Sequence, residues 1–529
     1  MSASKIAILV CFVLLLGVPV LFRPAETDRL PAGADHALSL IIITPHNEQI
    51  RYEFGRAFDA WHFANYGQRV NVIFNVPGGT SEIRKMLEAQ YSAAIEAGLE
   101  PGGDADLVFG GGSFEHGRLK RGVRGVVNGV ARDEPISAPV DFPDEWLAST
   151  YGQNRIGDDP LYDPDKHWFG TALSGFGIVY NNDVLDSLGL PAPSVWNDLC
   201  DPRLQGWVAL VNPNQSGSVT TAFESILKRS GWIEGWRILR RAGANARYFS
   251  ASSLKPPIDV SQGNAAMGVC IDFFGRYQSQ ALKEAGDPDR IGYVDPIGGS
   301  TIDSDPVSML RNAPHPELSR RFIEFCLSDA GQALWQFPRR SDSAPDQLGP
   351  QRFELRRMPI VRSMYERYFD RFIDRVNPFE LATPAEHPNP NFRDFIAPMF
   401  AAMAMDNHSE LKAAWSAIVN HREYHDLQRL LGSDQLNAQS LAVLYRQASS
   451  LDEMLALFDA MPTIAGPDGK EYSLSDVPQL GEIRAGWLRG QWADKNLWSA
   501  ESSPVDEMRK RFGAFFRDNY RRIVELADE

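Results

Sequence analysis

Cysteine is scarce in this chain, with 4 residues among 529. Cys11 lies in an apolar N-terminal run, and the other three stand alone in the sequence, so no disulfide framework is predicted. The paired C-x-x-C spacing of a thiolate metal centre does not occur. Cys270 and Cys326 lie in apolar segments, where a cysteine is most simply a small buried hydrophobic residue.

Positive charge is also in deficit, because 53 Lys and Arg residues face 68 Asp and Glu residues, a formal net charge of −15. We therefore expect neither nucleic acid nor an anionic membrane surface to be the main partner. The chain lacks a G-x-S-x-G elbow, an H-E-x-x-H helix and a carboxylate pair at a recognisable catalytic spacing, so we expect no enzymatic activity. Its 43% hydrophobic content is that of a globular protein, long enough for two or three domains.

Long hydrophobic runs are missing except at the N-terminus. Residues 6–22 are apolar or small, and as a helix they would extend about 25 Å, the lower limit for crossing a bilayer. We expect residues 1–34 to be either a signal peptide, cleaved at the small-residue site Ala32–Ala34, or an uncleaved membrane anchor. Both alternatives place the rest of the protein in the periplasm or another extracytoplasmic space, anchored in the inner membrane in the second case.

Strand and helix patterns alternate from residue 38 to about 330. Strands are expected in SLIIIT, VNVIFNV, ADLVFGGGS, FGIVYNND, GWVALVNP and NAAMGVCIDF, with amphipathic helices between them. Such alternation is typical of mostly parallel sheets covered by helices, an α/β fold. Residues 339–529 have a mainly helical pattern, and their apolar stripe over 361–376 must pack on its own helices or on the preceding domain. If it forms its own core, truncation after about Arg339 leaves a folded protein.

Polar residues that suit a ligand follow several of these strands. His46 and Asn47 come directly after the first strand; Asn47 fits a helix cap, whereas His46 is better explained by a ligand contact. Gly111 and Ser113 lie in a glycine-rich loop that lets a ligand approach the backbone. Ser216-Gly217-Ser218 opens a helix, where it would form an anion site or an ordinary cap.

Two aspartates are further candidates. Asp272 directly follows a buried strand, a position that core packing does not explain. Asp305 lies in the sequence STIDSDPVSML, where turn formation before Pro306 is an adequate alternative explanation.

Three stretches resemble bacterial periplasmic solute-binding proteins of ABC importers, the type 2 family that includes ferric-ion, thiamine, spermidine and phosphonate binders. They are GFGIVYNNDVLDSLGLPAPSVWNDLCDPRLQGWVALVNPNQSGS, VSQGNAAMGVCIDF and SDPVSMLRNAPHPELSRRFIEFCLSDAGQALW. Their order and spacing carry the resemblance, which extends from about Leu38 to Trp335. It implies two α/β lobes joined by two crossing strands, near Thr171–Phe176 and near Asp272–Tyr277, with the ligand in the cleft between the lobes.

The resemblance implies a two-lobed domain over residues 35–338. One lobe would comprise about 38–138 and 277–338, the other about 139–276, and the helical extension would follow over 339–529. His46-Asn47-Glu48 matches a His-x-Glu that supplies an iron ligand in ferric binders, but Phe273-Phe274 stands where those proteins carry adjacent tyrosines. We expect a ligand site made of His46, Asn47, Gly111, Ser113, Ser174, Ser216, Ser218, Asp272 and Asp305. His46 and Asp272 are the candidate metal ligands.

The expected function is the substrate-binding component of an ABC transporter, which captures a small polar solute, a metal ion or an anion. Its partners would be the ligand and the permease subunits, and we expect a monomer without a cofactor other than a metal ion bound as ligand. The alternative is a solute sensor or scaffold whose helical extension contacts a membrane signalling partner.

Overall fold

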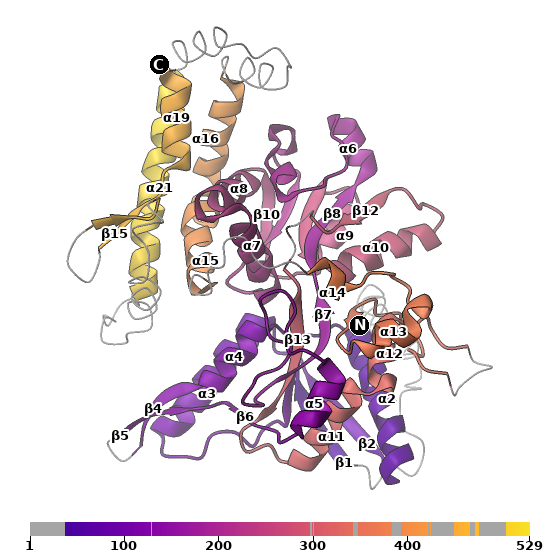
Figure 1. Ribbon diagram of the computed structural model, residues 1–529. Coiled ribbons are helices and arrows are strands. Elements are labelled where there is room, and N and C mark those ends of the chain that lie inside the picture. The colour runs from indigo at the N-terminus through magenta and orange to yellow at the C-terminus, as the bar shows by residue number, and fades with distance from the viewer. Residues whose placement is uncertain are drawn as a thin grey trace, which may run out of the picture.

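A computed structural model provides the structure of the protein (Figure 1). It describes residues 38–127, 130–296, 299, 301–341, 347–382, 393–421, 424, 449–465, 471–475 and 504–528. The expected signal peptide or anchor, residues 1–34, lies outside this part. Among the described residues, no helix has the length and apolar character to cross a membrane.

The first lobe is built on a seven-stranded sheet with the order β14-β7-β13-β3-β1-β2, with β6 paired to β13. Its parallel centre is formed by β1 (Leu38–Ile43), β2 (Val70–Asn75) and β3 (Leu107–Phe109). The strands β6 (Ser137–Ala138), β7 (Phe169–Ser174) and β13 (Asp303–Leu310) join antiparallel. The helices of this lobe are α2 (Glu48–Tyr66), α3 (Thr80–Glu96), α4 (Ser113–Arg121), α5 (Asp144–Tyr151), α11 (Pro316–Leu327) and α12 (Asp329–Gln336) (Figure 1). Apolar side chains of the sheet, such as Leu40 and Ile42, are fully buried.

The second lobe has a five-stranded sheet with the order β10-β9-β11-β8-β12. Its strands are β8 (Phe176–Asn181), β9 (Val208–Val211), β10 (Ala246–Ser250), β11 (Met267–Ile271) and β12 (Ile291–Val294). The central strands β9 and β11 are buried along their whole length, as their continuous apolar sequences predict. The covering helices are α6 (Asn182–Leu188), α7 (Gly217–Ser230), α8 (Trp232–Ala244), α9 (Lys255–Ser261) and α10 (Asp272–Glu284).

The two-lobed α/β fold with a mainly helical C-terminal part is confirmed, but one of the two points at which the chain changes lobe differs from the expectation. The first crossing falls at Gly175, between β7 of one sheet and β8 of the other, inside the expected range. The second expected crossing, near Asp272–Tyr277, is wrong, because Asp272 opens a helix of the second lobe. After that helix, β12 still pairs with β8, and the chain returns to the first sheet only with β13.

The sheets therefore divide the domain differently from the expected boundaries. Residues 139–174 lie with the first lobe through β7, and residues 277–294 lie with the second through β12. Residues 316–336 form two helices, since Ser328 ends α11 and caps α12 through its hydroxyl.

The first part of the extension completes the first lobe. Strand β14 (Met358–Pro359) pairs with β7 at the edge of the first sheet. The apolar stripe is a short helix, α13 (Ser363–Tyr368), and a 3-10 turn, after which the backbone N–H of Ile373 donates to the carbonyl of Gln336 on α12. The stripe thus packs on the preceding domain and not only on its own helices, and α14 (Pro378–Leu381) follows it.

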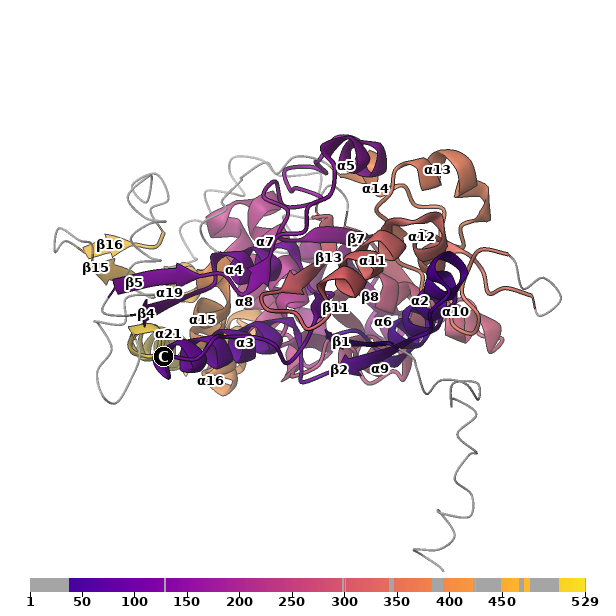
Figure 2. The same ribbon diagram turned by 90° about the horizontal axis from the view of Figure 1, so that it is seen from below.

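The second part of the extension covers the second lobe. It contains α15 (Arg393–Phe400), a π-helical turn (Ala401–Met405), α16 (His408–Asn420), α19 (Ser449–Asp459), the hairpin β15 (Thr463–Ala465) and β16 (Glu471–Ser473), and α21 (Pro504–Asp528). The helices α15 and α16 pack on α7 and α8, with the Phe400 ring 4.6 Å from that of Phe223. Figures 1 and 2 place α13 and α14 on the opposite side of the molecule from α19 and α21, so the extension reaches both lobes.

Candidate functional site

A cleft of about 340 Å³ lies between the two lobes. The first lobe contributes the turn after β1 and the N-terminus of α3, and the second contributes the start of α7 and the segment before α9. The segments that follow β1 and β9 and the last residue of β11 line the cleft, and the carboxyl ends of strands are where open α/β sheets bind ligands. The polar and aromatic side chains that line the cleft include His46, Asn47, Thr80, Ser216, Ser218, Ser252, Ser253, Phe273, Phe274, Asp305 and Arg357.

A buried charge network forms one wall of this cleft. The Arg357 guanidinium donates to Asp305 at 2.6 Å and to the Ser174 hydroxyl at 2.6 Å, and His46 Nε2 lies 2.8 Å from the same Asp305 oxygen. Burial alone would raise the pKa of Asp305, but Arg357 and His46 hold it well below its usual range. The Arg357 guanidinium also lies 4.7 Å from the centre of the Phe273 ring, so it contacts the second lobe as well.

The ionised Asp305 decides the tautomer of His46. A carboxylate only accepts, so Nε2–H of His46 donates to it, and the Arg357 contact to Nε2 at 3.2 Å is then not a hydrogen bond. Burial lowers the pKa of His46 even beside Asp305, so the ring is neutral. Its Nδ1 atom is then a bare acceptor, buried and without a hydrogen-bond partner among the described residues.

The N-terminus of α3 lines the same cleft. Gly79 precedes the helix and has no side chain to cap it, while Glu82 reaches back to the Gly79 amide at 3.0 Å. Across the cleft, the amide of Gly217 donates to the Thr80 hydroxyl at 2.9 Å, which joins the starts of α3 and α7. The lobes therefore touch directly, and the structure is a closed form.

The structure brings most of the expected site residues to the cleft. His46, Asn47, Gly111, Ser216, Ser218 and Asp305 line it, and Ser174 lies behind it, bonded to Arg357. Asn47 and Ser216 also cap α2 and α7, so the alternative reading of each as a cap describes them too. Ser113 does not line the cleft; its amide faces Asp303 at 3.4 Å.

The expected metal ligands are not brought together. Asp272 is fully buried, accepts the Phe273 amide at 2.8 Å and is not part of the cleft lining, because it opens α10 and faces the protein interior. The His46 Nε2 atom is used by Asp305. Across the described residues, no group of three or more His, Cys, Asp or Glu side chains is placed to hold a metal ion.

Arg357 is the residue that sequence reasoning missed. It lies in the C-terminal extension, 52 positions after Asp305 and 311 after His46, so no local spacing connects the three. The only available signal was a pair of arginines followed by the apolar residues of MPIV, the segment that becomes β14.

Gly79 makes a testable contribution to closure. A Cβ added there would lie 2.6 Å from the Gln215 carbonyl oxygen of the other lobe, although the backbone of Gly79 has φ −74°, which alanine adopts freely. We expect Gly79→Ala to destabilise the closed form by about 1–3 kcal/mol and to increase the radius of gyration in small-angle X-ray scattering. Gly117→Ala, where a Cβ meets no atom within 4 Å, is the matched control. An unchanged radius would show that the lobes close without this contact.

The buried ring of His116 gives a prediction about how stability depends on pH. The His116 ring lies 2.7 Å from the Ser308 hydroxyl and 3.2 Å from the Gly110 carbonyl, and burial lowers the pKa of His116 to about 4. The folded protein therefore stays unprotonated at His116 while the unfolded chain takes up a proton below about pH 6.5, so this residue reduces stability as the pH falls from 6.5 towards 4. Burial raises the pKa of Asp272 and of Asp303 to about 6, which gives a slope of opposite sign.

With falling pH, His116 lowers the stability whereas Asp272 and Asp303 raise it. The stability of the whole protein therefore does not isolate His116, and the titration must be measured at that residue. In histidine-labelled protein we expect the NMR signal of His116, assigned with His116→Gln, to show no titration between pH 7 and 5. A midpoint near 6.5 would contradict the buried, neutral ring.

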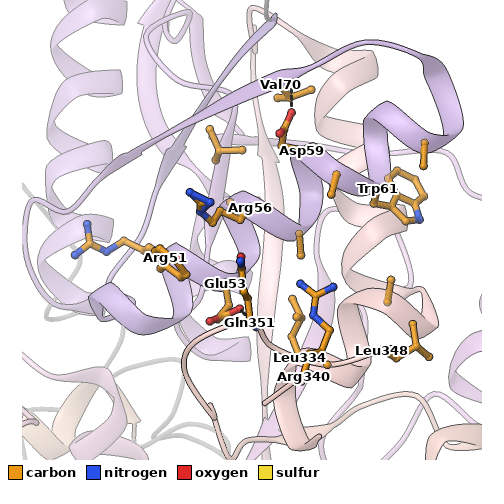
Figure 3. Close-up of a pocket in the computed structure, with 18 of the residues that line it drawn as sticks. Arg51, Glu53, Arg56, Asp59, Trp61, Val70, Leu334, Arg340, Leu348 and Gln351 are labelled. Atoms are coloured by element: carbon orange, nitrogen blue, oxygen red, sulfur yellow. Dashed lines mark hydrogen bonds between the residues drawn. The ribbon is translucent and has the colours of Figure 1, made fainter. Parts of the chain in front are cut away.

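A second, larger hollow of about 810 Å³ lies on the outer face of the first lobe. Figure 3 shows Arg51 and Arg56 of α2 beside it, with Arg340 and Gln351 from the start of the extension. The Glu53 carboxylate there accepts the amides of residues 351, 352 and 353 at 2.7–2.8 Å, which fastens the extension to α2. Since this hollow belongs to one lobe, lobe closure would not enclose a ligand in it.

Comparison with known proteins agrees with this architecture. Residues 132–347 match the family described as bacterial extracellular solute-binding protein. The match covers 216 of the 529 residues, less than half of the chain, and it agrees with the two-lobed α/β fold described above. The family's description names solute binding and an extracellular location.

One curated relative is the phosphoglycerate transport regulatory protein PgtC of Salmonella typhimurium, 30% identical over 163 residues. The match covers 31% of this chain and 39% of that protein, so it spans less than half of the relative's length. Among solved structures, AfuA from Actinobacillus pleuropneumoniae with fructose-6-phosphate bound has a TM-score of 0.48 and 17% identity, covering 71% of this chain and 97% of that one. Iron-bound HitA from Pseudomonas aeruginosa has a TM-score of 0.46 and 17% identity, covering 71% and 99%.

Proposed function

We propose that this protein captures a small anionic solute, a phosphorylated hydroxy acid such as phosphoglycerate, as the extracytoplasmic binding component of an ABC importer. The observation that carries the proposal is the donor-rich cleft between the lobes. The α3 N-terminus at Gly79 and Thr80, the serines Ser216 and Ser253, and Arg357 all line it. Amides at a helix N-terminus and guanidinium groups are the usual protein partners of phosphate and carboxylate.

The Asp305 carboxylate of the cleft is neutralised by an arginine, which favours an anion over a cation at this position. Asp305 is paired with Arg357, and Glu82 accepts the Gly79 amide. The name of the Salmonella relative, which refers to phosphoglycerate transport, supports phosphoglycerate as the first probe. A molecule of this size fits within about 340 Å³.

In this proposal the ligand draws the lobes together, and the closed form docks on the permease subunits. Isothermal titration calorimetry and thermal shift with 3-phosphoglycerate, inorganic phosphate, ferric citrate and a divalent metal series test it. Ligand at a hundred times its Kd should add about 2.7 kcal/mol to the stability of the folded state. A stabilising metal, together with no response to any anion, would contradict the proposal.

A second candidate is a solute sensor whose extension contacts a membrane signalling partner. The word regulatory in the relative's name and the helical layer of α15, α16, α19 and α21 on the second lobe favour it. Cross-linking in native membranes distinguishes the two candidates, since importer function predicts adducts with a permease and sensing predicts adducts with a receptor.

A further inference from the structure

Two buried arginines of the C-terminal extension reach the inner end of the cleft. Arg357 lies one residue before β14 and is anchored in the first lobe, whereas Arg393 begins α15 and is anchored in the second. Both positions follow residue 347, where the match to the solute-binding family ends. The extension thus supplies one cation from each side of the closing domain.

The two arginines line a small inner chamber together with Ser174, Ser218, Asp303 and Ser304. Its volume of about 10 Å³ is enough for one water-sized oxygen atom. Arg357 and Ser218 also line the outer cleft, so the chamber continues from it.

Each guanidinium is held by a carboxylate and keeps a donor unused. Arg357 pairs with Asp305, and Arg393 pairs with Glu224 at 2.7 Å and donates to the Gly217 carbonyl at 3.0 Å. The Nε atoms of both arginines and the Ser304 hydroxyl are buried and have no partner among the described residues. Buried donors of this kind are normally satisfied in a working protein.

Arg393 also connects the chamber with lobe closure. Although α15 packs on the second lobe, the Arg393 guanidinium lies 4.7 Å from the centre of the Phe114 ring on α4 of the first lobe. Separation of the lobes would break this contact and open the chamber. The two cations therefore come together only in the closed form.

We infer that Arg357 and Arg393 are specificity-determining residues, which bind an oxygen of a second anionic group on the ligand and make the extension part of the binding site. This inference rests on the proposed function and deepens it: the outer cleft binds one anionic group, and the chamber selects ligands that carry another.

Asp303 and Glu115 are the two carboxylates that line the chamber and would oppose an anion here. Glu115 is paired with Arg84, whereas Asp303 accepts a long contact from the Ser113 amide, at 3.4 Å. For Asp303 the burial itself reduces the opposition. Burial raises its pKa to about 6, so its carboxyl takes up a proton far more readily than a carboxyl in water.

Arginine-to-lysine variants test the inference without stranding a buried carboxylate. Arg357→Lys and Arg393→Lys keep a cation beside Asp305 and Glu224 but remove the Nε–H donors. Arg367→Lys is the matched control, because Arg367 belongs to the same extension and forms an exposed ion pair with Asp329 of α12. Affinity is measured by calorimetry for 3-phosphoglycerate, which carries a phosphate and a carboxylate, and for glycerol 3-phosphate, which lacks the carboxylate.

We expect wild type and the control to prefer 3-phosphoglycerate, and each chamber variant to lose roughly tenfold for 3-phosphoglycerate while its affinity for glycerol 3-phosphate stays within about twofold. Equal losses for both ligands would assign the arginines a structural role and overturn the inference. Unchanged selectivity would overturn it too, and would leave the proposed function intact. A wild-type protein that binds neither ligand would overturn the proposed function, and the inference with it.

Discussion

A chain that ends at residue 347 is expected to yield no soluble, cooperatively folded protein. The deletion removes β14 from the edge of the first sheet and takes Arg357 away from the buried Asp305. It also uncovers the face of the second lobe on which α15 and α16 pack, including Phe223, Trp232 and Trp236.

The free energy contributed by the buried apolar side chains supports this expectation. Each large apolar side chain contributes about 1.5–3 kcal/mol when it is buried, so exposing several exceeds the roughly 5–15 kcal/mol by which a domain is stable. Stranding a buried carboxylate adds to the loss. The condition for a folded protein after truncation near Arg339, an extension with its own separate core, is therefore not met, and we predict loss of folding instead.

An intermediate truncation separates the two parts of the extension. A chain that ends at residue 382 keeps β14, Arg357 and α13 but lacks α15 to α21. Hydrogen exchange should then show protection in β1 and β13 of the first lobe and reduced protection in β9 and β11 of the second. A soluble chain ending at 347 with a sharp thermal transition would show instead that the extension is dispensable.

The lobes could be predicted from the sequence because their pattern is local. Strands such as LSLIII and MGVCI are almost wholly apolar, and the helices between them start at Asn, Ser or Gly caps. Each of these signals lies within one element and its flanking residues. The alternation of the two patterns was then sufficient to predict the fold class.

The site could be predicted only in part, because its key contacts are long-range. The position of His46 after β1 was informative, but the ring owes its tautomer to Asp305, which lies 259 positions away. Asp305 itself was compatible with a turn, and its role became clear only because β13 places it in the sheet beside Arg357. Asp272 follows a strand as a ligand residue would, yet its burial follows from the packing of α10.

Breaking the Asp305–Arg357 pair is expected to cost about 3–5 kcal/mol in either single variant, because each leaves an uncompensated buried group. Both side chains are at most 4% exposed, so water cannot replace the missing partner. Asp305→Asn leaves the Arg357 cation without its carboxylate, and Arg357→Met leaves the Asp305 carboxylate with only His46 and the Gly111 amide. The double variant removes both charges and should cost clearly less than the sum of the two.

Urea unfolding followed by tryptophan fluorescence measures this cycle, since Trp335 lies 5.4 Å from the Arg357 guanidinium. The control is Arg367→Met, whose exposed pair with Asp329 should contribute less than about 1 kcal/mol. Since the pKa of Asp305 is held far below its unfolded value, its stabilisation is complete above about pH 4 and is lost only as the pH falls further. The loss in Asp305→Asn should therefore be the same at pH 5 and pH 8, and additive single-variant costs would show that the two groups do not stabilise each other.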